Sequence, residues 1–258
     1  MRIIVLVKDV PDTYGDRRLD PETGLADRTG SDHVIDEIDE RALEVALSHA
    51  DREPDTEVIV LSMAPAPASA SLRKALATGA TSAVHVVDDD LVGADLGLTA
   101  EVLAAAVRRS GYDLIVAGNV STDGSGGVIP AMLAELLGVA HLTALSAVDI
   151  RADRVSGTRA SDSGLLEVSA ELPAVVSITE ALPEARFPNF KGIMAAKKKP
   201  YETVSLADLG VAALDPAAPR AIMIAVAERP PRAGGVKLTD DGDAGARIAE
   251  YLVTNRLA

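Results

Sequence analysis

The sequence predicts an α/β fold built on a mostly parallel sheet. Up to Gly138, short runs of Val, Ile and Leu alternate with amphipathic segments of roughly 10–15 residues, the pattern of successive βαβ units. Three short apolar runs then follow one another with only turn residues between them, which is typical of antiparallel hairpins. Beyond Leu182, repeated prolines remove any regular period. We therefore expect a parallel core, antiparallel additions and an extended C-terminal arm.

Four apolar runs predict strands that are buried on both faces of the sheet. They cover residues 3–7, 57–62, 83–87 and 114–117, and the first, rich in β-branched residues, is expected at the centre. Helices are predicted over 36–50, 69–78, 96–110 and 130–137, where apolar residues recur every three or four positions. Gly79 suits the position just after a helix end. This alternation implies right-handed crossovers in a parallel sheet.

The remaining segments are less regular. Residues 9–31 hold Pro, Gly, Asp and Arg without an apolar period, which predicts a long loop of the kind that is often functional. Runs at 145–150, 154–159 and 165–170 predict the antiparallel hairpins, and 174–178 a further strand. In the arm, only 205–209 and 245–252 keep helical character. The prolines that punctuate this part are Pro183, Pro188, Pro200, Pro216, Pro219, Pro230 and Pro231.

Composition excludes several classes of protein. The chain has 258 residues, 48% of them hydrophobic, which is enough for a substantial core. Its formal net charge of −14 argues against nucleic acid or an anionic membrane as the main partner. The absence of cysteine excludes disulfides, thiol catalysis and Fe–S ligation. The longest later apolar run, 221–227, is far short of a bilayer, so we expect a soluble, cytoplasmic protein that is not embedded in a membrane.

The stretch from Tyr112 to Gly138 organises the chain. A buried strand leads into a loop of Gly, Ser and Asp, and a helix beginning near Pro130 follows. Free N–H groups at a helix start attract anions, and glycines let a ligand approach the backbone. The loop matches neither the Walker pattern nor GxGxxG, so an ordinary βα connection is an equally good interpretation of its spacing.

No catalytic constellation accompanies this loop. His33, His49, His85 and His141 lie on separate predicted elements without metal-ligand spacing, and no serine stands in a GxSxG turn. Asp88, Asp89 and Asp90 are better explained as a solvated turn than as a metal site. We therefore expect binding or electron transfer, not catalysis by side chains, and no metal.

Both phenylalanines of the chain lie between Leu182 and Lys199. Phe187, Phe190, Ile193 and Met194 stand there among Pro, Lys and Gly. One interpretation is a loop that folds its apolar residues onto its own core. The alternative is a protein-docking segment, because aromatic and Met anchors beside a lysine such as Lys197 are typical of interfaces.

Six segments together resemble the β subunit of electron-transfer flavoprotein, over nearly the whole length of the chain. They are IVLVKDVPDT at 4–13, DEIDERALEVAL at 36–47, LRKALATGATSAVHV at 72–86, YDLIVAGNVSTDG at 112–124, LPAVVSI at 172–178 and ARFPNFKGIMAAKKKP at 185–200. No single segment is diagnostic, but their order is, and the last is the most specific.

The resemblance implies a doubly wound domain of the adenine-nucleotide-hydrolase-like kind over 1–182, a partner-docking loop over 183–200 and an arm over 201–258 that packs on an α subunit. It implies a heterodimer whose redox FAD is held mainly by that α subunit, with a structural AMP in this chain. Electrons would pass from acyl-CoA or related dehydrogenases, as in fatty acid oxidation, to a membrane quinone oxidoreductase. The chain would be an electron carrier, not an enzyme.

The resemblance also implies site residues. The nucleotide positions are Leu6, Asp36, Glu37, Ile38, Asp39, Met63, Gly118, Asn119, Val120, Ser121, Thr122, Asp123, Gly124, Ser125, Gly126, Gly127, Val128 and Ile129. Thr13 occupies a flavin-proximal position where several relatives have a tyrosine, a departure for which the neighbouring Tyr14 is the expected substitute. The docking positions are Phe187, Phe190, Ile193, Met194 and Lys197, with Phe190 at the position of the family's anchoring leucine.

The chain departs from the family at the phosphate position. Many relatives have a segment like Asp-Asp-x-x-Asn-Gln-Thr there, whereas this chain has Gly and Ser, and the Val128 and Ile129 side chains cannot donate. Ala160 also stands where relatives often have a Glu. Backbone N–H groups of a Gly-rich turn still form an anion nest, with Ser125 as a hydroxyl donor. Two alternatives stay open: an electron-bifurcating variant with a second FAD in this chain, and a stand-alone nucleotide-binding regulatory protein.

Overall fold

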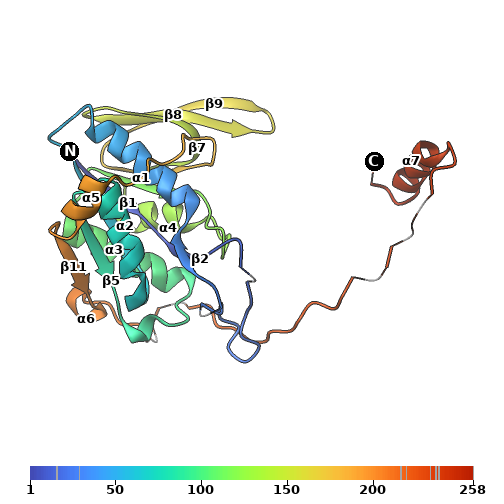
Figure 1. The fold of residues 1–258 in the computed structure, drawn as a ribbon, viewed down its shortest axis with the longest axis horizontal. Helices are drawn as coiled ribbons and strands as arrows, with labels where there is room; N and C mark the ends of the chain where they lie inside the picture. Colours follow the sequence, from blue (N-terminus) through green and yellow to red (C-terminus); the bar gives the residue numbers. More distant parts are fainter. Residues whose placement is uncertain are drawn as a thin grey trace. The chain divides into compact units, whose positions relative to one another are not determined.

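The computed structural model describes residues 1–15, 17–28, 30–215, 217–218, 220–232, 234–235, 237 and 239–257. Two of the prolines predicted to punctuate the arm, Pro216 and Pro219, lie outside these residues. The chain divides into two compact units, Met1–Ala225 and Val226–Ala258 (Figure 1). The first holds the sheet and both candidate sites. In the second, helix α7 (Ala244–Thr254) carries the exposed apolar residues Ile248, Tyr251 and Val253.

In the first unit, strands and helices alternate from β3 to β6. Its strands are β1 (Arg2–Leu6), β2 (Asp9–Pro11), β3 (His33–Ile35), β4 (Glu57–Met63), β5 (Ser82–Val86), β6 (Leu114–Gly118), β7 (Ala140–Ile150), β8 (Arg154–Ser161), β9 (Gly164–Glu171), β10 (Ala174–Ile178) and β11 (Tyr201–Val204). Its helices are α1 (Glu37–Ala50), α2 (Ser69–Thr78), α3 (Leu96–Ser110), α4 (Ile129–Leu137), α5 (Phe190–Ala196) and α6 (Leu206–Leu209), with 3₁₀ turns η1 (Ala66–Ala68) and η2 (Asp89–Leu91).

One sheet of nine strands organises this unit. Its order is β11-β5-β4-β1-β6-β10-β7-β8-β9. The strands from β11 to β7 are parallel, whereas β7, β8 and β9 pair antiparallel. β1 lies in the middle of the parallel part, as its β-branched sequence predicts. The mostly parallel α/β sheet with antiparallel additions is therefore confirmed.

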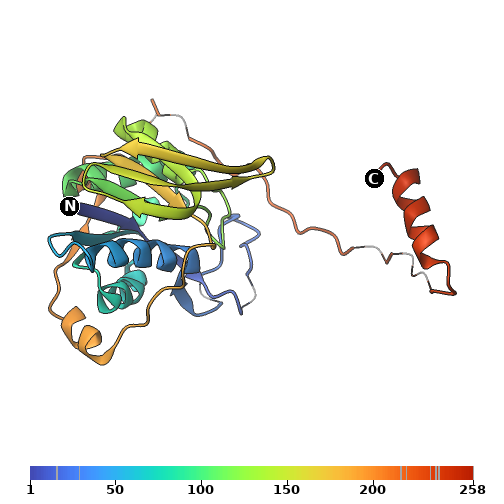
Figure 2. The same ribbon diagram turned by 90° about the horizontal axis from the view of Figure 1, so that it is seen from above.

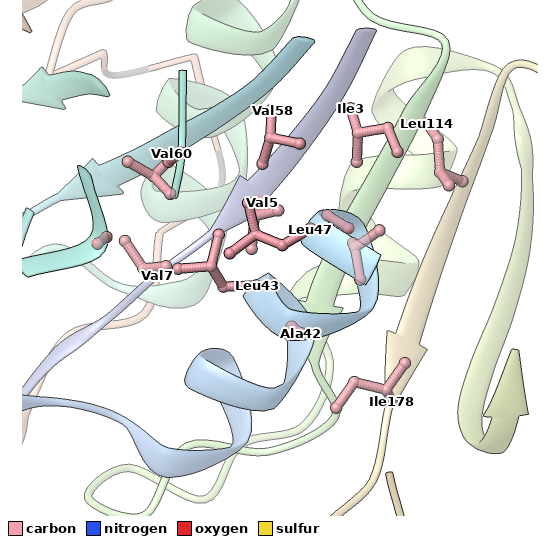
Figure 3. Close-up of a cluster of buried hydrophobic side chains, with 14 of the residues drawn as sticks. Ile3, Val5, Val7, Ala42, Leu43, Leu47, Val58, Val60, Leu114 and Ile178 are labelled. Atoms are coloured by element: carbon pink, nitrogen blue, oxygen red, sulfur yellow. The ribbon is translucent and has the colours of Figure 1, made fainter. Parts of the chain in front are cut away.

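Helices cover both faces of the parallel part, so the fold is doubly wound. Side chains alternate along β1: Ile3 and Val5 face α1 and α2, whereas Ile4 faces α3 and α4. Figure 3 shows Val5 of β1 beside Leu43 of α1 within the first of these clusters. In Figure 2, α1 (blue) and α4 (green) lie on opposite sides of the sheet. Burial on both faces explains why the core strands are continuous apolar runs.

Four segments differ from the sequence-based expectation. Residues 9–31 were expected to be a loop, but β2 begins at Asp9 and pairs antiparallel with β3. β7 begins at Ala140, five positions before the expected 145, because its first half pairs parallel with β10 and only its second half pairs with β8. The docking segment contains the helix α5. β11 extends the sheet beyond β5.

Candidate functional site

The nucleotide positions meet at the carboxyl edge of the sheet, where β1, β4 and β6 end side by side. We call residues 118–129, between β6 and α4, the nucleotide loop. The start of α1 lies against it, and the carboxylates of Asp36 and Asp39 accept hydrogen bonds from the loop's N–H groups and so tie α1 to the loop. In parallel sheets this edge is where ligands bind. The structure thus brings together residues from separate stretches of sequence.

Asp36 anchors the nucleotide loop to α1. Its side chain is 1% exposed and is the N-cap of the helix, with Oδ1 accepting from the N–H of Ile38 at 3.1 Å. Oδ2 accepts two further hydrogen bonds from Thr122, one from the backbone N–H and one from the hydroxyl, both at 2.7 Å. One carboxylate therefore fixes both the helix start and the middle of the loop.

Asp39 joins the strand ends beneath the loop. Its Oδ1 accepts from the Gly118 N–H at 2.9 Å and its Oδ2 from the Lys8 N–H at 2.8 Å. A Cβ at position 118 would lie 2.6 Å from Asp39 Oδ1, so only glycine lets α1 approach this closely. Burial, reinforced by the charge of Asp36, raises the pKa of Asp39 to about 7.

Asp123 lies among positive charges. Lys8 Nζ is 2.7 Å from its Oδ1, and an Arg28 guanidinium nitrogen is 3.4 Å from its Oδ2. The Gly124 N–H also donates to Oδ1, at 2.5 Å. Burial by itself would raise the pKa of Asp123, but the hydrogen bonds and charge of Lys8 outweigh burial and lower it. Asp123 is thus a carboxylate that stays ionised.

The second half of the nucleotide loop turns sharply into α4. Ser125 and Gly127 have positive φ angles of 50° and 65°, and the Ser125 N–H donates to the Ser121 carbonyl. Within the part of the chain that the structure describes, the backbone N–H groups of Gly126, Gly127, Val128 and Ile129 make no hydrogen bond. Such donors at a helix start suit an anion.

A polar acceptor is also available in this corner. Asn119 Oδ1 is buried and accepts no hydrogen bond from the residues that the structure describes. A buried acceptor without a partner is costly, so a donor group of a ligand, or water, suits this position. The cations Lys8 and Arg28, the unpaired N–H groups and this oxygen fit a nucleotide: a phosphate together with a donor-bearing base or sugar.

Not every nucleotide position faces the loop. Leu6 is 8% exposed and packs in the core, Ile38 is buried, and Met63 packs against the α3 side of the sheet. Glu37 is exposed, and Val120 packs against the α1 cluster. Their side chains shape the corner and make no hydrogen bond or ion pair with the residues that the structure describes.

Three basic residues at this corner were missed by sequence reasoning: Lys8, Arg17 and Arg28. Arg17 donates to the carbonyl and hydroxyl of Thr122, and to the Pro11 carbonyl. They come from β1's end and from the 9–31 segment, which has no apolar period to place it. In the sequence, Lys8 directly follows a buried strand, and this placement was a usable signal for a basic residue at the edge of the sheet. Thr13 and Tyr14 lie on the same segment, and the Tyr14 side chain is 99% exposed.

Of the docking positions, Phe190, Ile193 and Met194 lie on the short helix α5, and Phe187 and Lys197 flank it. α5 begins after Asn189, whose side chain accepts from the Gly192 N–H at 2.8 Å. Phe187 and Phe190 are 92% and 80% exposed, and Ile193 and Met194 about half exposed. Lys197 is exposed as well. The expectation that these residues are available to a partner thus agrees with their exposure, whereas tucking onto the chain's own core does not.

The docking segment (residues 183–200) is fastened to two helices. Arg186 donates to both oxygens of Glu44 on α1, at 2.8 and 2.7 Å, and lies 2.8 Å from Asp51. Further along, Arg73 of α2 donates to the Ala196 carbonyl at 3.0 Å. Lys199 Nζ donates to the carbonyls of Leu76 and Ala80 at the end of α2. Lys199 therefore serves the fold, whereas the side chains of Lys197 and Lys198 are exposed.

Two classes of site are not found. Across the described ranges, His, Asp and Glu side chains form no group placed to hold a metal ion. Of the helices described, none is long and apolar enough to span a bilayer.

The chain is similar to known proteins over nearly its whole length. A model of the electron transfer flavoprotein domain matches residues 23–209. An electron transfer flavoprotein subunit beta of Mycobacterium bovis is 42% identical, covering 99% of this chain and 98% of the relative. The corresponding subunit of Megasphaera elsdenii is 30% identical over 100% of both. Subunit CarD of the caffeyl-CoA reductase–Etf complex of Acetobacterium woodii is 33% identical over 82% of this chain and 80% of the relative.

Proposed function

This chain belongs to the electron transfer flavoprotein family, as a β subunit, and from that premise we propose how it works. It pairs with an α subunit that holds the redox FAD. The heterodimer diffuses in the cytoplasm, takes electrons from acyl-CoA or related dehydrogenases and delivers them to a membrane quinone oxidoreductase. The observation that carries this proposal is the 42% identity to a β subunit over 99% of the chain. The chain supplies binding surfaces, and the bound flavin supplies the redox chemistry.

We further propose that the nucleotide loop holds a structural AMP. Support comes from the four unpaired N–H groups of residues 126–129, the nearby cations Lys8 and Arg28, and the unpartnered Asn119 Oδ1. The N–H groups and cations suit a phosphate, and the asparagine oxygen suits a donor such as an amino or hydroxyl group. In this role the nucleotide ties β6, α4 and the end of β1 together.

We propose that the docking segment contacts the dehydrogenase. Phe190 stands at the start of α5, largely exposed, on a helix that is fastened through Arg186 and Lys199. An exposed aromatic side chain beside lysines, on a backbone that is already held in place, has the character of an interface anchor, because the backbone loses little freedom on binding.

The test is to identify the bound small molecules. The chain is co-expressed with its α subunit, purified, and denatured with acid, and the released compounds are separated by chromatography. One FAD and one AMP per heterodimer are expected. Two FAD per heterodimer would contradict the AMP proposal and indicate an electron-bifurcating carrier. FAD without AMP would remove the nucleotide from this chain and leave the docking proposal standing. A chain that stays stable without any flavoprotein partner would favour the stand-alone regulatory protein.

A further inference from the structure

Asp123, in the nucleotide loop, places a negative charge next to the cations Lys8 and Arg28. Its side chain is 9% exposed, and its Oδ1 receives Lys8 Nζ at 2.7 Å and the Gly124 N–H at 2.5 Å. Arg28 lies 3.4 Å from the other oxygen. An ammonium, a guanidinium and a backbone N–H are the groups that proteins commonly use to hold a phosphate.

The loop does not depend on Asp123 for its position. The Asp36 carboxylate holds the N–H and hydroxyl of Thr122, and Arg17 donates to the Thr122 carbonyl. On the other side, the Ser125 N–H donates to the Ser121 carbonyl at 3.0 Å. Thr122 and Ser125, on either side of Asp123 and Gly124, are therefore fixed by bonds that the Asp123 side chain does not make, so the carboxylate can leave its partners while the ends of this turn stay in place.

Gly124 lies in contact distance of Lys8 and carries no side chain that would cover it. The nearest atoms to a Cβ built at Gly124 are Lys8 Nζ and Ser121 Oγ, both at 3.6 Å, which is an ordinary van der Waals distance. Lys8 is 41% exposed along its side chain, so it can reach an anion that approaches from solvent. An incoming phosphate at Gly124 would meet Lys8 and Arg28 while the carboxylate of Asp123 still competes for them.

We propose that Asp123 is the specificity-determining residue of the nucleotide site: its carboxylate occupies the contacts that a phosphate needs, and so lowers affinity for nucleoside phosphates relative to nucleosides. This inference rests on the proposed nucleotide site. When AMP binds, Lys8, Arg28 and the Gly124 N–H release the carboxylate of Asp123 and contact the phosphate instead. Two anions in one such site repel each other, so the charge of Asp123 sets how tightly the phosphate is held.

The test compares the co-purified heterodimer with its Asp123→Asn variant after exhaustive dialysis. Asparagine keeps the size of the side chain and an oxygen for Lys8 and the Gly124 N–H, but removes the charge. Equilibrium dialysis with labelled AMP and with labelled adenosine measures the two dissociation constants. We expect AMP to bind Asp123→Asn about tenfold more tightly or better, and adenosine to bind equally to both proteins.

Two matched variants isolate the cause. Asp90→Asn removes one charge from an exposed acid outside the nucleotide loop, and should leave both dissociation constants unchanged. Lys8→Met added to Asp123→Asn should cancel the gain in AMP affinity, because the liberated ammonium is what the phosphate uses. Melting temperatures of all variants report whether the fold is intact.

The outcomes separate this inference from the proposed function. If the unaltered protein binds AMP and Asp123→Asn binds it no more tightly, Asp123 does not compete and only the further inference fails. If the unaltered protein does not bind AMP but Asp123→Asn does, competition is supported and the structural AMP of the proposed function is wrong. If neither protein binds AMP, both are wrong. Equal gains for AMP and adenosine would also overturn the inference, since charge competition acts on the phosphate alone.

Discussion

Gly192 of α5 lies directly against the carbonyl oxygen of Ala77 near the end of α2. A Cβ at position 192 would overlap that oxygen, so no other residue lets α5 pack this closely. This contact, together with Arg73 and Lys199, positions the helix that presents Phe190. The proposed docking surface is therefore a packed element of the fold.

Replacing Gly192 by Ala should displace α5 from α2. The clash is with backbone, which cannot rotate away, so we expect a loss of stability of about 1–3 kcal/mol, seen as a lower melting temperature of the heterodimer. Electron transfer from the dehydrogenase should weaken as well. Gly245→Ala is the control, because a Cβ there meets nothing within 4 Å. Equal melting temperatures for Gly192→Ala and the unaltered protein would contradict the tight packing.

Replacing Phe190 by Ala should weaken docking without disturbing the carrier. The side chain is 80% exposed, so its loss costs the fold little, whereas loss of an interface anchor typically costs about 2 kcal/mol, or roughly 30-fold in kcat/KM. Steady-state reduction of the heterodimer by its dehydrogenase measures this, with bound FAD as a check. Leu165→Ala removes a similarly exposed apolar residue, 72% exposed on β9, and should have no effect. An unchanged kcat/KM for Phe190→Ala would contradict the proposed docking role of Phe190.

Replacing Arg186 by Lys should loosen the docking segment from α1. Lysine keeps the charge but cannot place two N–H groups on Glu44 and a third contact on Asp51. We expect KM for the dehydrogenase to rise by about fivefold while kcat stays the same, since the anchor itself is intact. Arg151→Lys, at an exposed pair with Asp149, serves as the control. A fall in kcat with unchanged KM would be the opposite of this expectation.

Asp39 should make stability depend on pH. The pKa of its carboxyl is about 7 in the fold, against the ordinary value of 3.8, so between these values the folded state holds a proton that the unfolded state has released. The contribution of Asp39 to the free energy of unfolding therefore falls as pH rises between these two pKa values, by up to about 1.4 kcal/mol per pH unit. Above the higher value it no longer changes with pH. In Asp39→Asn, the part of the pH dependence that Asp39 contributes should vanish.

The measurement is the melting temperature of the heterodimer against pH, taken as the difference between the unaltered protein and Asp39→Asn. The difference cancels the other carboxylates, several of which have lowered pKa values and act in the opposite direction. Glu37→Gln changes an exposed acid on the same turn and should leave the curve parallel to that of the unaltered protein. Parallel curves for Asp39→Asn would mean that Asp39 keeps an ordinary pKa.

The core of the fold could be predicted from the sequence because burial on both faces leaves a plain signal. The runs around Ile3, Val58 and Leu114 are continuously apolar, and amphipathic helices separate them. The position of β10 could not be predicted: it comes after the hairpin in the chain, yet lies between β6 and β7. Pairing of that kind depends on tertiary contacts, which leave no local period.

The candidate site was predictable only in part. Asp36 and Asp39 belong to a recognisable helix start, and Gly118 follows a buried strand. Arg17 and Arg28 reach the loop from a segment without period, so nothing local connects them to Thr122 or Asp123. α5 was missed because it has seven residues, one of them glycine, and owes its stability to packing on α2. Asn189, a good N-cap residue, was its local signal.

The placement of β10 also bears on how the chain is made. A ribosome delivers β6 and β7 first, and these two strands are not neighbours in the finished sheet. Until residue 178 has emerged, β7 has only β8 as a partner, and the edge of β6 that later receives β10 is bare. A nascent chain at this stage exposes an apolar strand edge of the kind that invites wrong pairing. The hairpin of β8 and β9 gives β7 an early pairing partner, β8. Strand β10 then pairs with β6 on one side and β7 on the other.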